Sequence, residues 1–412
     1  MLHCGILLHT MKIAILSDLH LGYERFREDA LAQAREALFA ASEAADAILI
    51  AGDVFDYRHP KPEIMAEAIS LFRPLISTAF GATVSEFSGR GRAYTSIPII
   101  AIPGTHERRT DGEIDPIDVL NLAGMLVNAN QAAVTIKKGD EKILVYGVGG
   151  TAEERFRETL SRLSPKPVPG TFSIFLFHQS VFELLPFSKD FITLEELPEG
   201  FDLYVDGHIH SRVESKCHGK DFLIPGSTVL TQLKEGEQES KGFFIYDTML
   251  KSYEFRRINS RKFSMVRIDV SGMTSSEASS AIRQEIAKTT PKESGEKPVI
   301  RVVLEGKLKE GSKSIDLGIR EMIEENSSAA IIEVNKASMD SPCSKNAEDL
   351  REGILENLSI SDYGLSIFLE LLSKSGYNLN INPSEIFAML SAEGPKETII
   401  KSVTERILSR GL

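Results

Sequence analysis

The sequence predicts an α/β protein built from buried strands that alternate with amphipathic helices. Two observations carry this prediction. Between residues 11 and 210 short apolar runs recur along the chain, and segments with apolar residues at helical spacing separate several of them. Residues 263–337 then repeat the alternation over a shorter length. Such alternation is typical of α/β folds, in which helices cover the faces of a sheet.

The first part of the chain holds most of the predicted strands. They occupy residues 11–17, 47–51, 97–102, 142–148, 172–177 and 201–205, and shorter strands follow at 222–224, 242–246 and 252–258, the last two as a hairpin. Helices are predicted at 28–45, 63–78, 151–163 and in the segment through Leu120 and Leu126, and Pro74 is expected to kink or shorten the second helix. Residues 81–96 are polar and show no clean period, which indicates a loop.

The length of 412 residues exceeds one ordinary core, so two or three domains are expected. We predict an N-terminal extension at 1–10, a main domain at 11–262, a second domain at 263–337, a linker at 338–345 and a helical region at 346–412. The second domain has a β-α-β-α-β order, with strands at 264–270, 299–305 and 330–334 and helices at 275–289 and 315–324.

Composition narrows the class of protein. A hydrophobic content of 42% and a charged content of 26% are typical of a soluble globular protein. No apolar run approaches the roughly 18 residues needed to span a membrane. The three cysteines are far apart, which argues for a reducing cytoplasm and against a disulfide framework or structural zinc. The net charge of −12 counts mildly against DNA as a substrate, but carboxylates that bind cations are locally neutralised.

Five of the apolar strands end in residues that can bind a metal. These residues are Asp18, His20, Asp53, His106, His178, His208 and His210. Taken singly, an Asp after a strand is more often a turn residue. A His-x-His pair is about as often two surface histidines in a loop as a metal site. Five of the 9 histidines nevertheless lie at these strand ends, where sites form in α/β sheets. The joint pattern therefore predicts one metal centre.

The ligand types indicate the chemistry. Oxygen from Asp and nitrogen from His, without thiolate, favour manganese, iron or zinc in a mixed site. Two aspartates and four histidines exceed what one catalytic metal needs, so two metals are expected, with Asp53 as the candidate bridge. Two metals about 3.5–4 Å apart can lower the pKa of a bound water, orient a phosphate and stabilise both the attacking and the leaving oxygen. The chemistry implied is therefore phosphate-ester hydrolysis. The chain has no P-loop motif and is therefore not itself an ATPase.

These motifs resemble the calcineurin-like metallophosphoesterases. The resemblance rests on Asp18-x-His20, Gly52-Asp53-x-x-Asp56, Gly104-x-His106-Glu107, His178 and Gly207-His208-x-His210. Three further blocks are similar to the SbcD-type (meiotic-recombination-eleven) double-strand-break repair nucleases: Asp18-Leu19-His20-Leu21-Gly22-Tyr23, Gly207-His208-Ile209-His210 followed by Pro225-Gly226-Ser227, and Lys241-Gly242-Phe243. The resemblance implies a four-layer αββα sandwich, a DNA-binding capping domain at 263–337 and a helical region that binds a coiled-coil ABC ATPase of the SbcC type. It also implies a homodimer and manganese.

The resemblance further implies a role for each site residue. One metal would bind Asp18, His20, Asp53 and His210, and the other would bind Asp53, residue 105, His178 and His208. His106 would act on the leaving oxygen or on the charge of the transition state. The family has Asn where this chain has Thr105, whose hydroxyl is a weaker and shorter ligand.

Other polar residues near these motifs have less defined roles. Asp56 is expected to support the ligands from outside the metal shell. Arg58, Lys61, Arg108 and Arg109 follow the metal loops and can meet phosphates, although a solvated charged loop explains them equally well.

Three functions follow from this reading. The first is a manganese-dependent DNA exonuclease and endonuclease that works with the ATPase on double-strand-break ends. The second is a metallophosphoesterase acting on a phosphoprotein or a small nucleotide, which the acidic charge permits. The third is a DNA-end-binding scaffold with weak catalysis, which Thr105 keeps open.

Overall fold

The computed structural model describes residues 11–77, 82–86, 91–94, 97–108, 113–185, 190–290 and 296–339. These residues belong to one compact unit, which comprises Met1–Leu185 and Lys189–Ser341. The predicted extension at 1–10 and the predicted helices at 346–412 lie outside the described residues.

Two mixed sheets form the main body. The six-stranded sheet has the order β14-β13-β1-β2-β5-β6. Its strands are β1 (Lys12–Leu16), β2 (Ala47–Ile50), β5 (Ile99–Ala101), β6 (Val127–Asn128), β13 (Gly242–Asp247) and β14 (Ser252–Arg257). The eight-stranded sheet has the order β11-β12-β10-β9-β8-β7-β3-β4. Its strands are β3 (Ala82–Glu86), β4 (Gly91–Tyr94), β7 (Ala132–Lys138), β8 (Glu141–Val148), β9 (Phe172–Phe177), β10 (Leu203–Asp206), β11 (Val213–Cys217) and β12 (Lys220–Ile224).

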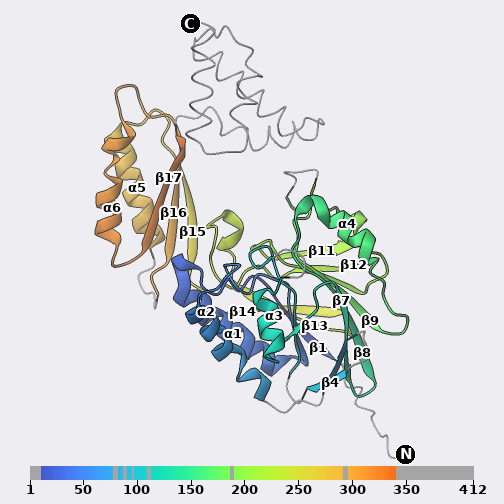
Figure 1. Ribbon diagram of the computed structural model, residues 1–412. Helices are drawn as coiled ribbons and strands as arrows, with labels where there is room; N and C mark the ends of the chain where they lie inside the picture. Colours follow the sequence, from blue (N-terminus) through green and yellow to red (C-terminus); the bar gives the residue numbers. More distant parts are fainter. Residues whose placement is uncertain are drawn as a thin grey trace, which may run out of the picture. The chain divides into compact units, whose positions relative to one another are not determined.

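The two sheets pack face to face because their strands are apolar on both sides. In β1, Ile13 and Ile15 lie in the core between the sheets, whereas Ala14 and Leu16 face the helices. Helices α1 (Arg27–Ala44), α2 (Pro62–Phe72) and α3 (Pro116–Leu122) cover the outer face of the six-stranded sheet (Figure 1). Helix α4 (Glu153–Leu163) packs on the outer face of the eight-stranded sheet through Phe156. The predicted four-layer αββα sandwich is thereby confirmed.

Most predicted elements of this body are present, but three predictions need correction. Residues 81–96 were predicted as a loop, yet β3 and β4 pair as an antiparallel hairpin, and β3 also pairs with β7. Pairing at the edge of the sheet outweighs the weak strand propensity of this segment. The helix expected through Leu126 ends at Leu122, because Leu126 is buried in the core just before β6. Strands β6, β7 and β11 were not predicted at all.

The remaining elements are short. One-turn 3-10 helices lie at η1 (Glu24–Phe26), η2 (Leu75–Ser77), η3 (Leu194–Glu196) and η4 (Glu235–Gln238). As expected at Pro74, α2 stops before the proline and η2 follows it. Among the described residues no helix combines the length and apolar character needed to cross a membrane.

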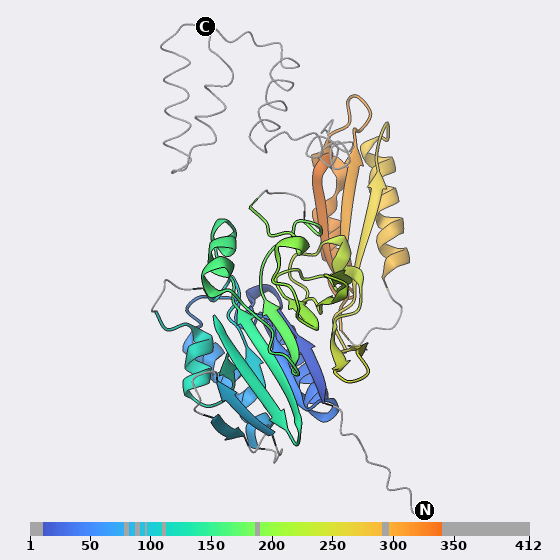
Figure 2. The same cartoon turned by 90° about the vertical axis from the view of Figure 1, so that its right-hand side faces the viewer.

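A three-stranded parallel sheet follows the main body in sequence. Its strands are β15 (Phe263–Asp269), β16 (Val299–Gly306) and β17 (Ile331–Met339), joined by α5 (Ser275–Thr289) and, after η5 (Ser314–Leu317), by α6 (Ile319–Asn326). The helix predicted at 315–324 is therefore interrupted, because Gly318 has a φ of +62° between η5 and α6. Both helices lie on one side of the strands (Figure 2). We call residues 263–339 the βαβ module.

The other face of the βαβ module packs on the main body. Phe263 and Val299 of the module share an apolar cluster with Phe26. Arg261, just before the module, forms a two-pronged ion pair with the Asp29 carboxylate. The division into domains stays a prediction, and β17 extends to Met339, into the segment predicted as a linker.

Candidate metal centre

The predicted ligands lie at the carboxyl ends of parallel strands from both sheets. Strands β1, β2 and β5 are parallel neighbours in the six-stranded sheet, and β9 and β10 are parallel neighbours in the eight-stranded sheet. Backbone hydrogen bonds join the loops that follow within each sheet, from Asp18 N to Gly52 O at 3.0 Å and from Gly207 N to Phe177 O at 3.2 Å. Between the sheets, His178 Nδ1 lies 2.7 Å from the Ala51 carbonyl oxygen. The ends of the two sheets therefore meet at one edge of the sandwich, as sites in open α/β sheets do.

Glycine allows this close approach. A Cβ atom on Gly207 would lie 2.0 Å from the Ala51 carbonyl oxygen and 2.6 Å from His178 Nδ1. A Cβ atom on Gly104 would lie 2.1 Å from Asp53 Oδ1. Because such contacts are shorter than any real Cβ makes, only glycine at 207 lets loops of the two sheets touch, and only glycine at 104 lets the loops after β2 and β5 touch.

Several ligand residues have an unusual backbone conformation. Asp18, His20, Asp53 and His208 have φ values of +52°, +46°, +48° and +71°. Non-glycine residues adopt this left-handed region at a cost of roughly 1–3 kcal/mol each, and such residues concentrate at functional sites. The conformation turns each side chain inward as the chain leaves its strand.

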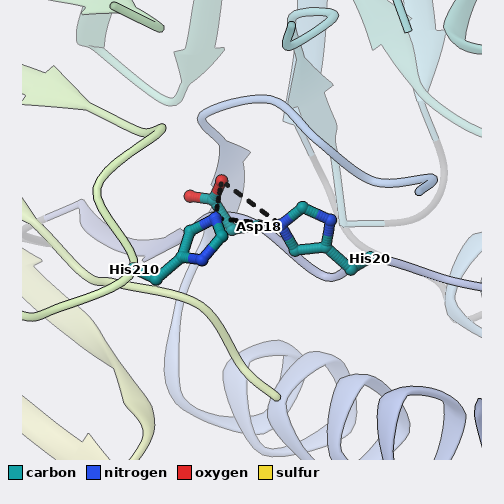
Figure 3. Close-up of side chains that lie close together, drawn as sticks. All are labelled: Asp18, His20 and His210. Atoms are coloured by element: carbon teal, nitrogen blue, oxygen red, sulfur yellow. Dashed lines mark hydrogen bonds and ion pairs between the residues drawn. The ribbon is translucent and has the colours of Figure 1, made fainter. Parts of the chain in front are cut away.

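The first ligand group comprises Asp18, His20 and His210, whose polar ends converge (Figure 3). The His20 and His210 Nε2 atoms are 3.1 Å apart. Asp18 Oδ1 lies 3.8 Å from His20 Nε2 and 3.6 Å from His210 Nε2. Asp18 and His20 are almost fully buried, and His210 is nearly so.

The second ligand group comprises Asp53, His178 and His208. His178 Nε2 lies 3.3 Å from Asp53 Oδ2, with both side chains buried. Burial alone would lower the pKa of His178, but the Asp53 carboxylate outweighs it and raises this pKa to about 10. Burial and the adjacent His178 lower the pKa of His208 to about 4. His178 and Asp53 therefore carry opposite charges, and a divalent cation can replace the proton between them.

Asp53 connects the two groups. His20, Asp53 and His106 form a third set of close ligand atoms, so Asp53 neighbours both histidine pairs. Burial would raise the pKa of Asp53, but the surrounding His178, His20 and His106 hold it well below its ordinary value. The position of Asp53 therefore fits the predicted bridge.

Three predicted residues contact members of the centre without belonging to the first or second ligand group. Thr105 Oγ1 is 3.4 Å from Asp53 Oδ2, and the His106 backbone N–H donates to Asp53 Oδ1 at 2.9 Å. The His106 side chain is 43% exposed, which makes it the most accessible of these histidines to an incoming substrate. Asp56 Oδ1 lies 3.0 Å from His20 Nδ1 and 3.5 Å from His106 Nδ1 and thus supports both rings.

The Nδ1 contacts determine how three of the imidazoles point. His178 Nδ1 is 2.7 Å from the Ala51 carbonyl, His106 Nδ1 is 2.9 Å from the Asp56 carbonyl, and His20 Nδ1 faces the Asp56 carboxylate. Each partner is an acceptor, so each Nδ1 carries a proton and donates. In a neutral ring the lone pair is then on Nε2, which faces the centre in His20 and, once a cation replaces its second proton, in His178.

The donor atoms fit a divalent cation. Asp18 Oδ1 and His178 Nε2 are buried and have no hydrogen-bond partner among the described residues. A buried acceptor without a donor is costly unless a cation or proton occupies the space before it. Carboxylate oxygens and imidazole nitrogens are ligands that manganese, iron and zinc accept.

Sequence reasoning assigned no role to Glu107, although its motif included the residue. The buried Glu107 carboxylate accepts the backbone N–H groups of Phe55 and Gly104, both at 2.8 Å. It thereby joins the loops after β2 and β5. The sequence signal for this role was the position of Glu107 directly after His106.

The predicted basic residues differ in exposure. Arg58 and Lys61 are exposed, Arg108 is half-buried, and Arg109 lies outside the described residues. Their contact with phosphates stays a prediction.

Comparisons with known proteins identify the class. A family model described as calcineurin-like phosphoesterase matches residues 11–212. This stretch contains every predicted ligand. Residues 11–212 thus form a calcineurin-like phosphoesterase domain, which confirms the prediction of a metal-dependent phosphoester hydrolase.

Within this family the chain is similar to the Mre11 double-strand break repair proteins. The protein from Methanopyrus kandleri is 27% identical over 316 residues, covering 70% of this chain and 66% of that protein. The protein from Sulfurisphaera tokodaii is 28% identical over 316 residues, covering 72% and 74%. The Homo sapiens protein is 27% identical over 301 residues, covering 63% of this chain and 41% of that protein.

Replacing Gly207 with alanine should disrupt the centre. The new methyl must displace the Ala51 carbonyl or the His178 ring, at a cost of about 1–3 kcal/mol in unfolding free energy. We expect at least a tenfold loss of manganese affinity, measured by titration calorimetry, and a lower melting temperature.

Gly219→Ala is the control. Its Cβ would meet nothing within 4 Å, and its φ of +73° imposes only a backbone cost. Manganese affinity should stay unchanged in this variant. Wild-type affinity in Gly207→Ala would contradict the close-packing argument.

Proposed function

We propose that the protein is a manganese-dependent DNA nuclease that processes double-strand-break ends by two-metal phosphodiester hydrolysis. The observation that carries this proposal is the convergence of ligand atoms from five strand ends, in groups whose atoms lie within 4.8 Å of one another. The similarity to Mre11 repair proteins supports DNA as the substrate.

The proposed ligand sets share Asp53. One metal takes Asp18, His20, Asp53 and His210, and the other takes Asp53, Thr105, His178 and His208. Bound metals would lower the pKa of a water molecule and neutralise charge on the phosphate. The chain's own residues hold the imidazoles in the orientation that this requires, through acceptors at His20 Nδ1 and His178 Nδ1.

His106 is the proposed catalytic residue. Its Nδ1 donates to the Asp56 carbonyl, which leaves Nε2 to exchange a proton with the leaving oxygen or to stabilise charge on the phosphate. Its exposure supports contact with the substrate rather than a purely structural role.

The proposed partners are DNA, a second copy of the chain and a coiled-coil ABC ATPase of the SbcC type. The βαβ module would contribute to DNA binding, and Arg58, Lys61, Arg108 and Arg109 would contact phosphates. The ATPase would bind residues 346–412, which lie outside the described residues. We propose the cytoplasm as the location.

The nuclease proposal can be tested with end-labelled duplex DNA in manganese, magnesium or EDTA. We expect manganese-dependent degradation that is lost with EDTA and reduced by about 10²–10⁴-fold in His106→Ala, the usual contribution of a proton-transfer group. The variant should still bind manganese.

Two other outcomes would favour the competing functions. Hydrolysis of a small phosphodiester without DNA cleavage would favour a small-substrate phosphoesterase. DNA binding without any hydrolysis would favour the scaffold.

Thr105→Asn tests whether the threonine limits the second metal. The amide oxygen of asparagine reaches further than the hydroxyl and is a better neutral ligand. Tighter binding of one of two manganese ions is expected by titration calorimetry, with Thr105→Ser as the control that keeps a hydroxyl. An unchanged isotherm in Thr105→Asn would show that residue 105 is not a ligand.

Removing residues 346–412 tests the ATPase-binding region. The truncated chain should lose co-purification with an SbcC-type ATPase and keep its manganese-dependent nuclease activity. Retained binding would assign this region another role.

A further inference from the structure

The ligand His210 differs from the other oriented imidazoles because its Nδ1 contacts a hydroxyl, Thr231 Oγ1. A hydroxyl can donate or accept, so it does not by itself determine which nitrogen of the ring carries the proton. Thr231 begins a segment, residues 231–238, that ends with the 3-10 helix η4. What surrounds Thr231 in this segment decides the direction of the hydrogen bond.

A buried carboxylate organises the segment. Glu237 is 3% exposed, and its two oxygens accept the backbone N–H groups of Thr231, Gln232 and Leu233 at 3.0, 2.8 and 2.6 Å. The Lys241 ammonium, itself 5% exposed, donates to Glu237 Oε1 at 3.0 Å. Burial would raise the pKa of Glu237, but Lys241 and the N–H donors hold it below its ordinary value. Glu237 is therefore ionised and can only accept.

The ionised carboxylate imposes a direction on the Thr231 hydroxyl. Thr231 Oγ1 lies 3.2 Å from Glu237 Oε1, and between these two atoms only the hydroxyl has a proton to donate. A lone pair of Oγ1 is then left for His210, so His210 Nδ1 must donate. His210 Nε2 therefore presents its lone pair to Asp18 and His20.

We propose that Thr231 and Glu237 are positioning residues that hold His210 in the Nδ1–H tautomer required of a metal ligand. The proposal rests on the proposed function, since it assigns to His210 the role of a metal ligand. Hydrogen-bond partners of ligand histidines typically contribute about 10–100-fold to metal affinity.

The βαβ module holds the same segment from the opposite side. The Arg301 guanidinium, on β16, donates to the carbonyls of Gln232 and Leu233 at 3.3 and 3.0 Å. Leu233 is fully buried with a φ of +52°, a conformation that needs support from its surroundings. Glu237 binds the N–H side of these residues and Arg301 binds their carbonyl side. Through Arg301 the module therefore contributes to the orientation of His210.

The decisive variant is Thr231→Val, which keeps the shape of the side chain and removes the hydroxyl. We would record nitrogen chemical shifts of ¹⁵N-labelled histidine in metal-free protein and assign His210 by its loss in His210→Gln. Wild type should show one Nδ1–H tautomer at His210, and Thr231→Val should show a mixture. Manganese affinity of the site should fall about 10–100-fold.

Thr231→Ser is the rescue, because it restores the hydroxyl and should restore both the tautomer and the affinity. Thr231→Ala replaces Thr231→Val if circular dichroism shows that valine prevents folding. A single Nδ1–H tautomer together with wild-type manganese affinity in the hydroxyl-free variant would overturn the proposal. The tautomer result holds even if wild type cleaves no DNA, so failure of the nuclease proposal remains distinguishable.

Arg301→Met tests the contribution of the βαβ module. It keeps the apolar stem and removes both carbonyl contacts, so manganese affinity should fall below that of wild type. Arg25→Ala is the matched control, since it removes an ion pair of 2.6 Å with Glu333 of the module without touching residues 231–238. Equal affinities in the two variants would remove Arg301 from the proposal.

Discussion

The structure depends on holding acceptor atoms of several side chains against one another. Asp18 Oδ1 and the Nε2 atoms of His20 and His210 lie within 3.1–3.8 Å of each other, and most of their surroundings are buried. Lone pairs so close together repel unless a positive charge lies between them. An apolar core that spans both sheets supplies the rigidity that keeps them in place, because the strands on which the ligands depend are fully buried on both faces. The centre is thus built for a cation before any cation arrives.

The backbone around these side chains must also adopt unusual conformations to bring them together. Asp18 and Asp53 have left-handed backbone conformations, Gly104 lets two loops of the six-stranded sheet touch, and Gly207 lets loops from opposite sheets touch. These features destabilise the fold locally, and neighbouring hydrogen bonds such as those of Glu107 offset them. The family motifs therefore contain two kinds of residue: those proposed to bind the metal, and those whose small size or unusual conformation lets the others approach.

The sequence predicted the strands that carry ligands because each is a continuous apolar run buried on both faces. It failed at β3, β4, β7 and β11, where strands near the sheet edges are short or largely polar and tertiary pairing decides the outcome. The seven residues proposed as ligands or catalyst could be recognised because each lies within a few residues of a strand end. The sequence did not predict Thr231 or Glu237, because Thr231 reaches His210, and Glu237 reaches Thr231, only in the folded chain, 21 and 27 residues after His210. Hydrophobic periodicity and residue propensity predict single helices and strands, whereas these contacts depend on how helices, strands and loops pack in the folded chain.

The four supported histidines show why such distant contacts matter. His178 and His106 donate to backbone carbonyls, which can only accept, so their orientation follows from the main chain itself. His20 donates to a carboxylate, which also only accepts when ionised. The hydroxyl next to His210 is the one ambiguous partner among these, and it is also the one backed by a buried ion pair, between Glu237 and Lys241. A buried pair of this kind adds little stability because desolvation offsets the attraction between its charges. Its value here is directional: it converts a partner that could accept or donate into one that can only accept from the ring.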